Sequence, residues 1–222
     1  MPPMGNVGNA FTLPFKSADW FPRLLLMGLM ILIPIIGWMN LTGWMLATLD
    51  NYRRGVVELP PAGFQYIGRG AALFAVQLVY GIILGIIFVV PLFAFNVVSL
   101  TAANAGNPYG AGGFNSGFTG FAQLVQLGEF IFFPSVVILT DRHGFAGGLN
   151  VPAVWRMAAT NWKFSLLAAV LLWASSIAGS LGIAVCCVGI LVSYPYSLAV
   201  NAGIVRYFEA TFEPPQQVPQ AY

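Results

Sequence analysis

The sequence predicts an all-α membrane protein, a polytopic bundle of about six hydrophobic helices with amphipathic helices at the membrane interface. Its composition is 58% hydrophobic and only 7% charged, whereas soluble domains carry about 25% charged residues. Three long segments, residues 24–49, 70–128 and 164–205, contain no acidic, basic or histidine side chain. Because roughly 20 apolar residues cross a bilayer as a helix, these segments predict several spans.

The first hydrophobic segment, residues 21–49, is too long for one upright span. As a straight helix it would measure about 43 Å, against a hydrocarbon core of about 30 Å. It fits one tilted span, or two short helices that meet at Pro34–Gly37, because proline removes a backbone hydrogen bond and glycine tolerates a turn. Lysine and arginine favour the cytoplasmic side of a membrane. The hairpin brings all nine basic residues to that side, whereas a single crossing leaves Lys16 and Arg23 outside, so the sequence favours the hairpin.

Two further spans follow, at residues 71–99 and 118–140. The first of them is expected to end near Pro91 or to run on with a kink there. Between the two spans, residues 101–117 are rich in glycine and asparagine and carry no charge, which predicts an external loop.

The last apolar segment, residues 164–205, would reach about 63 Å as one helix, twice the hydrocarbon thickness. The chain must therefore turn back within it. Glycine and other small residues in "SSIAGSLG" at 175–182 weaken a helix, so the turn is expected there, between helices near 164–180 and 184–208.

Two polar stretches share one plan: "RRGVVELPPAGFQYIGRGAALF" (53–74) and "RHGFAGGLNVPAVWRMAATNWKF" (142–164). Each runs from arginine and glycine to proline and then to a short expected helix before a span. In the second, Asn150 is a helix cap and Pro152 stands in the first turn. One apolar stripe follows, made of Val151, Val154, Trp155, Ala158, Ala159 and Trp162. A basic amphipathic helix of this kind is expected to lie in the membrane interface.

The chain is expected to form one transmembrane domain, residues 21–208, with both termini cytoplasmic. Residues 1–20 would form a cytoplasmic segment. The proline- and glutamine-rich residues 209–222 would form a disordered tail.

Residues 14–63, 151–172 and 186–208 together resemble the domain of unknown function 4013 family of bacterial and archaeal polytopic membrane proteins. The stretch "LPPAGF" (59–64) departs from the family, which usually has an acidic, tryptophan-rich stretch after the proline. The resemblance implies an integral protein of the cytoplasmic (bacterial inner) membrane with cytoplasmic termini. It carries over no catalytic or binding residue.

Glu129 is the only acidic or basic residue well inside a predicted span, and Gln123 and Gln126 share its helix face. Ionisable groups in the membrane are costly, so they mark functional sites by default. Glu129 is therefore either a permeation or proton-coupling residue or a protonated structural group. In both cases it is expected to face the bundle interior and to reach a polar partner such as Gln77, Asn96 or Asn201.

Candidate contacts to anionic lipid or to a partner protein are Arg53, Arg54, Trp155, Arg156 and Lys163. Anchoring of the topology alone also explains the arginine pair. The adjacent cysteines at 186–187 and the single histidine, His143, lack further ligands, so neither a metal, a cofactor nor a catalytic site is expected.

The sequence favours a non-enzymatic scaffold or assembly protein that contacts membrane lipids. The sequence leaves open whether the protein binds partner membrane proteins or forms a homo-oligomer. The GxxxG motif "GIILG" at 81–85 serves either packing within the chain or contact with a second copy. The alternative is a small-molecule or ion transporter or channel that uses Glu129. An enzyme acting on lipid ranks third, since no nucleophile, metal ligand set or carboxylate pair is found. Scattered basic residues exclude nucleic acid as a partner.

Overall fold

The computed structural model describes residues 7–104, 112–184 and 189–212, and these residues form helices without any strand. The all-α class is therefore confirmed. The 3-10 helices are η1 (Val7–Phe11), η2 (Leu13–Lys16) and η3 (Met30–Leu32). The α-helices are α1 (Trp20–Leu29), α2 (Ile36–Arg53), α3 (Ile67–Asn104), α4 (Gly112–Gly148), α5 (Val151–Thr160), α6 (Trp162–Ala184) and α7 (Ile190–Ala210).

Helices α1 and α2 are separate, as the favoured hairpin requires. The chain leaves helix at Leu32 and re-enters it at Ile36, with Pro34 in the turn. Ile35 adopts a φ of 64°, in the left-handed region that β-branched residues rarely occupy. The predicted break in residues 21–49 is confirmed, and a straight helix through this segment is excluded.

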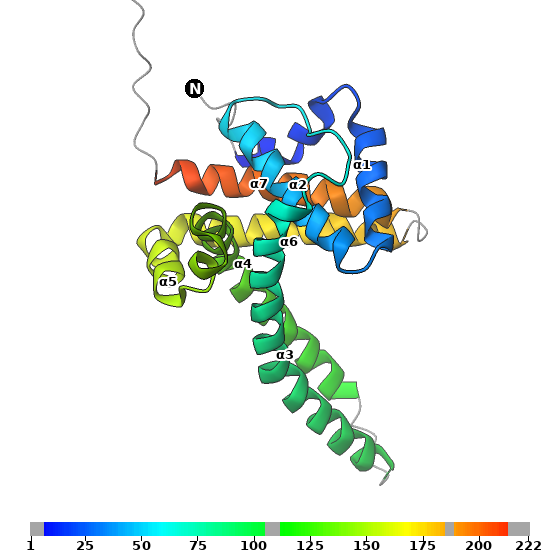
Figure 1. Cartoon of the computed structure of the whole chain (residues 1–222). Helices are drawn as coiled ribbons and strands as arrows, with labels where there is room; N and C mark the ends of the chain where they lie inside the picture. The colour runs from blue at the N-terminus through cyan, green and yellow to red at the C-terminus, as the bar shows by residue number, and fades with distance from the viewer. Residues whose placement is uncertain (1–6, 105–111, 185–188, 213–222) are drawn as a thin grey trace, which may run out of the picture.

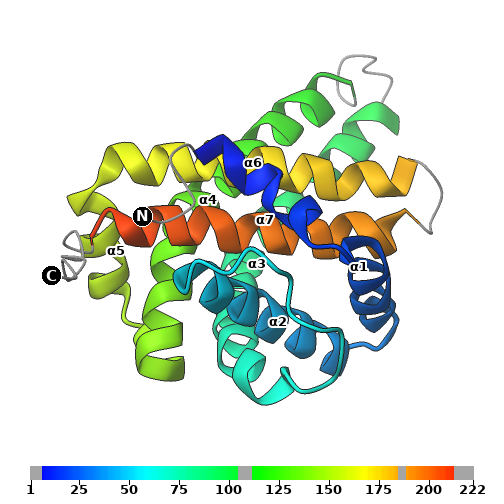
Figure 2. The ribbon, with the colours of Figure 1, turned by 90° about the horizontal axis from the view of Figure 1, so that it is seen from above.

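Helix α7 lies at the centre of the fold, between α6 on one side and α2 on the other (Figure 2). Helices α1, α2, α4 and α6 all pack against it. Its buried side chains include Leu198, Val205 and Phe208, which share one apolar core with Trp44 of α2. The N-terminal segment also packs on α7, where the Tyr196 hydroxyl donates a hydrogen bond to the Phe11 carbonyl at 2.9 Å.

The turn between α6 and α7 does not lie at 175–182, and this prediction is wrong. Helix α6 continues through that stretch to Ala184. Its small residues allow α7 to approach closely instead: the Ser193 hydroxyl donates to the Gly179 carbonyl at 2.6 Å, and Gly182 lies against Gly189. Tertiary packing therefore overrides the weak helix propensity of glycine.

Helices α3 and α4 form a long pair that projects from the rest of the molecule and is inclined steeply to α6 and α7 (Figure 1). Helix α3 runs on beyond Pro91 to Asn104. Residues 101–104 and 112–117 are helical although a loop was expected, while 105–111 lie outside the described residues. Near its end α4 is kinked at Gly144, where φ is 67°.

Within the residues that the structure describes, two helical stretches are long and apolar enough to cross a membrane, Ile67–Ile87 and Trp162–Ser180. Six membrane-crossing helices remain a prediction.

The two stretches with a shared sequence plan fold differently. Residues 55–66 contain no helix and run back along α2, where the Asn40 amide donates to the Gly63 carbonyl at 2.8 Å. The first unit therefore has no separate short helix, and its helical part, from Ile67 on, is the start of α3 itself. In the second unit the cap of α5 is confirmed, because the Asn150 side chain accepts a hydrogen bond from the Ala153 amide at 3.1 Å.

Helix α3 begins by crossing α2 at two glycines. Gly43 and Gly70 face each other so closely that a Cβ on either residue would strike backbone atoms of the other segment. The Thr42 hydroxyl donates to the Gly70 carbonyl across the crossing, at 3.1 Å. This contact places the start of α3 beside the first half of α2.

Candidate functional site

An ion-pair cluster joins the C-terminal ends of α2, α4 and α7 to the N-terminal end of α3. We call it the Arg53 cluster. Its members are Asp50, Arg53, Arg69, Asp141, Arg142, Arg206 and Glu209.

Arg53 is the centre of this cluster and binds three carboxylates. Its Nε and Nη2 atoms donate to the two oxygens of Glu209, at 2.8 and 2.9 Å. Its Nη1 atom donates to Asp141 at 2.6 Å and to Asp50 at 2.9 Å. A guanidinium suits this task because its planar fork matches a carboxylate with two parallel hydrogen bonds. Arg53 thereby ties the end of α2 to the ends of α4 and α7.

Two further arginines complete the pairing of the same carboxylates. Arg69, in the first turn of α3, donates to Asp141 at 2.8 Å and also to Asp50. Arg142 donates to Glu209 at 2.7 Å. Each acid of the cluster therefore meets at least two guanidinium groups.

Electrostatics favour the charged state of these acids. Burial raises the pKa of the Glu209 carboxyl, but hydrogen bonds from Arg53 and Arg142 outweigh burial, so this pKa lies below its ordinary value. The same balance holds for Asp50, where Arg69 and Arg53 lower the pKa more than burial raises it. Both groups are thus carboxylates at neutral pH, held by arginine and poor proton acceptors.

The cluster is built for holding helices together rather than for catalysis. Its carboxylates are occupied by guanidinium groups, which leaves no general base within it. In the described part of the chain no group of three or more histidine, cysteine or acidic residues is placed to hold a metal ion. Cys186 and Cys187 lie outside the described residues.

The sequence analysis did not single out Asp50, Asp141 and Glu209. Each stands within three residues of an arginine at the end of an apolar segment: "DNYRR" (50–54), "DR" (141–142) and "RYFE" (206–209). Such acids beside basic anchors are a usable signal, because an acid at a span end has no role in the positive-inside rule. The sequence does not predict which acid pairs with which arginine, since partners such as Arg53 and Glu209 are 156 positions apart.

A second feature is an apolar cavity of about 700 Å³ between α3, α4 and α5, which we call the α3–α4 cavity. Its walls include Gln77 and Tyr80 of α3, Glu129 and Phe132 of α4, and Trp155 of α5. The rings of Phe132 and Trp155 stack at 5.5 Å between centroids. Such a volume falls in the range of small-molecule sites, about 300–1,000 Å³.

Glu129 lines this cavity but does not make the expected internal hydrogen bond. Its side chain is exposed. Within the described residues it forms no hydrogen bond or ion pair. In particular, it makes none with Gln77 or Asn201, two of the expected partners. Gln126 is half-buried on the same helix, and the side chains of Gln123 and Asn96 lie outside the described set. The expected polar partner is therefore absent at both described positions, and a functional role for Glu129 stays a prediction.

The remaining candidate residues lie on the surface. Trp155 and Trp162 are 62% and 57% exposed, and Arg156 and Lys163 are exposed beside them. The Lys163 ammonium lies 5.9 Å from the centre of the Trp162 ring. We call these four residues the α5 patch. The expected apolar stripe is thus divided, because Val154 and Ala158 point into the protein whereas the tryptophans point out.

Arg53 and Arg54 point to different environments although they are adjacent. Arg53 is partly buried and uses its guanidinium group to bind the carboxylates of the Arg53 cluster. Arg54 is exposed and donates to Asn51 of its own helix at 2.6 Å.

A family profile described as "Protein of unknown function (DUF4013)" matches residues 26–193, which is more than half of the chain. The chain belongs to the DUF4013 family. The matched part of this DUF4013 protein contains the whole α3–α4 cavity and the α5 patch, but it ends before Glu209. No curated protein and no solved structure matched the chain.

Proposed function

We propose that this DUF4013 protein is a multi-pass protein of the cytoplasmic membrane that acts without catalysis. It would serve as a scaffold whose cytoplasmic face contacts lipid headgroups and partner proteins. The observation that carries the proposal is the large apolar surface of the helices. Exposed examples are Leu32, Leu78, Ile82, Ile86, Leu167 and Val170, which are 40–70% exposed. Soluble monomers rarely leave contiguous apolar surface of this kind open.

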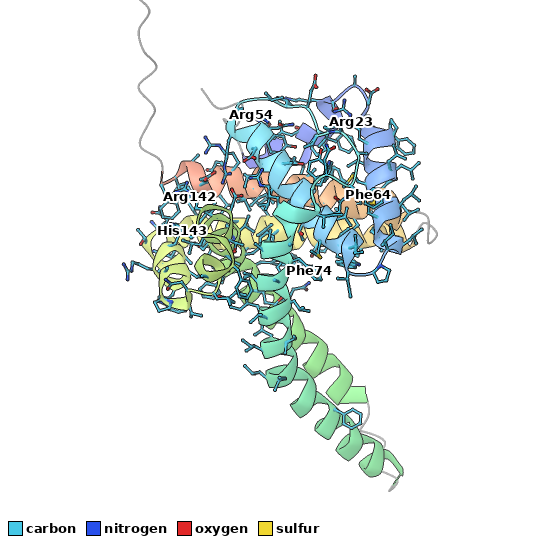
Figure 3. All side chains as sticks on the ribbon, in the orientation of Figure 1. Arg23, Arg54, Phe64, Phe74, Arg142 and His143 are labelled. Atoms are coloured by element: carbon cyan, nitrogen blue, oxygen red, sulfur yellow. The ribbon has the colours of Figure 1, made fainter. Side chains whose placement is uncertain are left out.

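The charged residues support the same orientation. Arg54, Arg142 and His143 lie at the side of the molecule opposite the tip of the α3–α4 pair (Figure 3). The Arg53 cluster, to which Arg142 belongs, gathers six further charged groups from four helix ends in the same region. We therefore place this side, with both termini, in the cytoplasm.

The α5 patch is the proposed contact to lipid. Tryptophan favours the boundary between headgroups and acyl chains, and basic residues near an anionic surface each contribute about 1 kcal/mol. The α5 patch combines both, since Trp155 and Arg156 of α5 and Trp162 and Lys163 in the first turn of α6 are all exposed. We infer that it lies along the cytoplasmic interface.

The double variant R156Q/K163Q tests this contact. We expect the wild-type protein to retain phosphatidylglycerol over phosphatidylcholine in native mass spectrometry. The variant should show that preference reduced about thirtyfold, since two charges near the surface are worth about 2 kcal/mol. R54Q, an exposed arginine away from α5, is the matched control. Equal preference in the double variant and the wild type would contradict the proposal. A pull-down in mild detergent with the same variants reports on partner proteins.

A transporter or channel is the second candidate, and the α3–α4 cavity is the observation that favours it. Glu129 lines it, and an ionisable group in a membrane cavity marks many transport pathways. Under this alternative, E129Q would abolish transport in a folded protein. Under the scaffold proposal, the same variant would leave lipid retention by the α5 patch unchanged.

A further inference from the structure

The α3–α4 cavity owes its space to two glycines on facing helices. Gly81 of α3 and Gly128 of α4 both line it, and a Cβ built on either residue would meet nothing within 4 Å. A side chain at either position would therefore begin in open space beside the cavity, and we expect a large one to reduce the cavity volume. Gly85, one turn further along α3, is equally open but does not line the cavity.

The polar groups of the cavity are unequally occupied. The Tyr80 hydroxyl already donates to the Gly148 carbonyl at 2.9 Å. Glu129 and Gln77 make no hydrogen bond within the described residues, and Glu129 is the only charged side chain among the described lining residues. The cavity thus presents one unpaired carboxyl group within apolar and aromatic walls.

We propose that the α3–α4 cavity binds a free amphiphilic amine, with its apolar tail against the aromatic walls and its ammonium group on Glu129. An ammonium donates charge-assisted hydrogen bonds, which are about twice as strong as neutral ones. Phe130, Phe132 and Trp155 offer aromatic faces that also attract a cation. A ligand without the positive charge would leave the carboxyl group without its strongest partner.

The position of Glu129 favours a free amine over a lipid headgroup. Twelve residues of α4 separate it from Asp141 in the Arg53 cluster, which corresponds to about 18 Å. The ammonium of a phospholipid lies at the membrane surface and does not reach this depth, whereas a single-tailed amine dissolved in the bilayer does. This step rests on the membrane position proposed above.

Binding of dodecylamine and of dodecanol to the protein in phosphatidylcholine nanodiscs, followed by native mass spectrometry, tests the proposal. The two probes share one tail and differ in the head group. We expect the wild type to bind dodecylamine about tenfold more tightly than dodecanol, because a charge-assisted hydrogen bond contributes at least that difference in affinity. E129Q should bind the two probes equally.

Cavity-filling variants test the location. G128L and G81L fill the space from opposite walls and should lose both probes, whereas the matched variant G85L should keep wild-type binding. Size-exclusion profile and melting temperature report whether each variant folds. If one of the two filling variants does not fold, the other is enough to test the location of the site.

Three results would overturn the proposal. The first is equal binding of both probes by the wild type, and the second is unchanged binding by a folded G128L or G81L. The third is displacement of dodecylamine by phosphatidylethanolamine in the wild type, which would assign the site to a lipid headgroup. Extraction with alkaline carbonate tests the proposed membrane position independently. Release of the protein from membranes would contradict that position, whereas the binding results above decide whether the cavity binds the amine.

Discussion

Glu209 is the most buried member of the Arg53 cluster, with a side chain only 3% exposed. It receives two hydrogen bonds from Arg53 and one from Arg142. Replacing one partner of a buried pair is costly because the other charge stays behind without compensation. The cost is moderated here, since Arg53 and Arg142 are partly open to water.

We therefore expect E209Q to lose about 2–3 kcal/mol of unfolding free energy, somewhat less than the roughly 3–5 kcal/mol of a fully buried ion pair that loses one partner. Thermal unfolding in detergent measures it as a lower melting temperature. Glu58 is exposed, so E58Q is the matched control and should change stability by less than about 0.5 kcal/mol. Equal melting temperatures for E209Q and the wild type would contradict a stabilising role of the cluster.

The lowered pKa of Glu209 also predicts a pH dependence of stability. A carboxyl group whose pKa is depressed in the folded state stabilises the protein above its ordinary value of 4.5, and this contribution is lost as the pH falls through the folded-state pKa. The melting temperature of the wild type should therefore fall below about pH 4.5 more steeply than that of E209Q, which lacks this titration. Parallel curves for the two proteins would exclude Glu209 as the group responsible.

At the scale of the elements, close helix contacts are made by glycines whose spacing in the sequence shows no motif. The crossing of α2 and α3 depends on Gly43 and Gly70, and α1 meets α7 at Gly28, where a Cβ would strike the Leu191 backbone. By contrast, a Cβ at Gly81 or Gly85, the GxxxG pair, would meet no atom of the described residues within 4 Å. Spacing alone therefore does not find the glycines of the close helix contacts, because the partner surface decides which ones are needed, and a dimer through the GxxxG pair stays a prediction.

G70A tests this packing directly. Its methyl group would strike the Met39 carbonyl, so α2 and α3 must separate, and we expect a loss of about 2–4 kcal/mol, as for overpacked cores. Gly68 lies two residues earlier on α3, and a Cβ added there would meet nothing within 4 Å. G68A should keep or slightly raise stability, because alanine favours a helix over glycine. Similar melting temperatures for the two variants would refute the tight crossing.

At the scale of the whole molecule, the proposed orientation predicts a labelling pattern in intact cells. Single cysteines replace Val56, Thr160 or Gly110 in a chain whose Cys186 and Cys187 have been changed to alanine. Val56 and Thr160 are exposed on the proposed cytoplasmic side, and Gly110 lies between α3 and α4. An impermeant thiol reagent should label G110C and leave V56C and T160C unlabelled. The reverse pattern would invert the topology, and labelling of all three would exclude the proposed map.

The sequence by itself determined the helical class, the break between α1 and α2, the cap of α5 and the family. These are local properties: apolar runs, Pro34 and the Asn150 cap act over a few residues, and the pattern of the chain contains them. The same local reasoning misplaced the turn of α6, because Gly179 and Gly182 are weak helix formers that α7 holds in helix. It also predicted a separate short helix after the prolines of residues 53–74, whereas contacts with α2 hold the chain without helix up to the start of α3 at Ile67.

Only the tertiary structure decided which charges pair and where the chain is hollow. Arg53 reads as a surface anchor in the sequence, yet it is bound to Asp141 and Glu209, which lie 88 and 156 positions away. Glu129 stood out as an isolated charge, but its place in a cavity depends on Gly81 and on α5, which come from other segments. Such contacts depend on how whole helices cross, and the crossing angles are set by side chains of both partners rather than by either sequence segment alone.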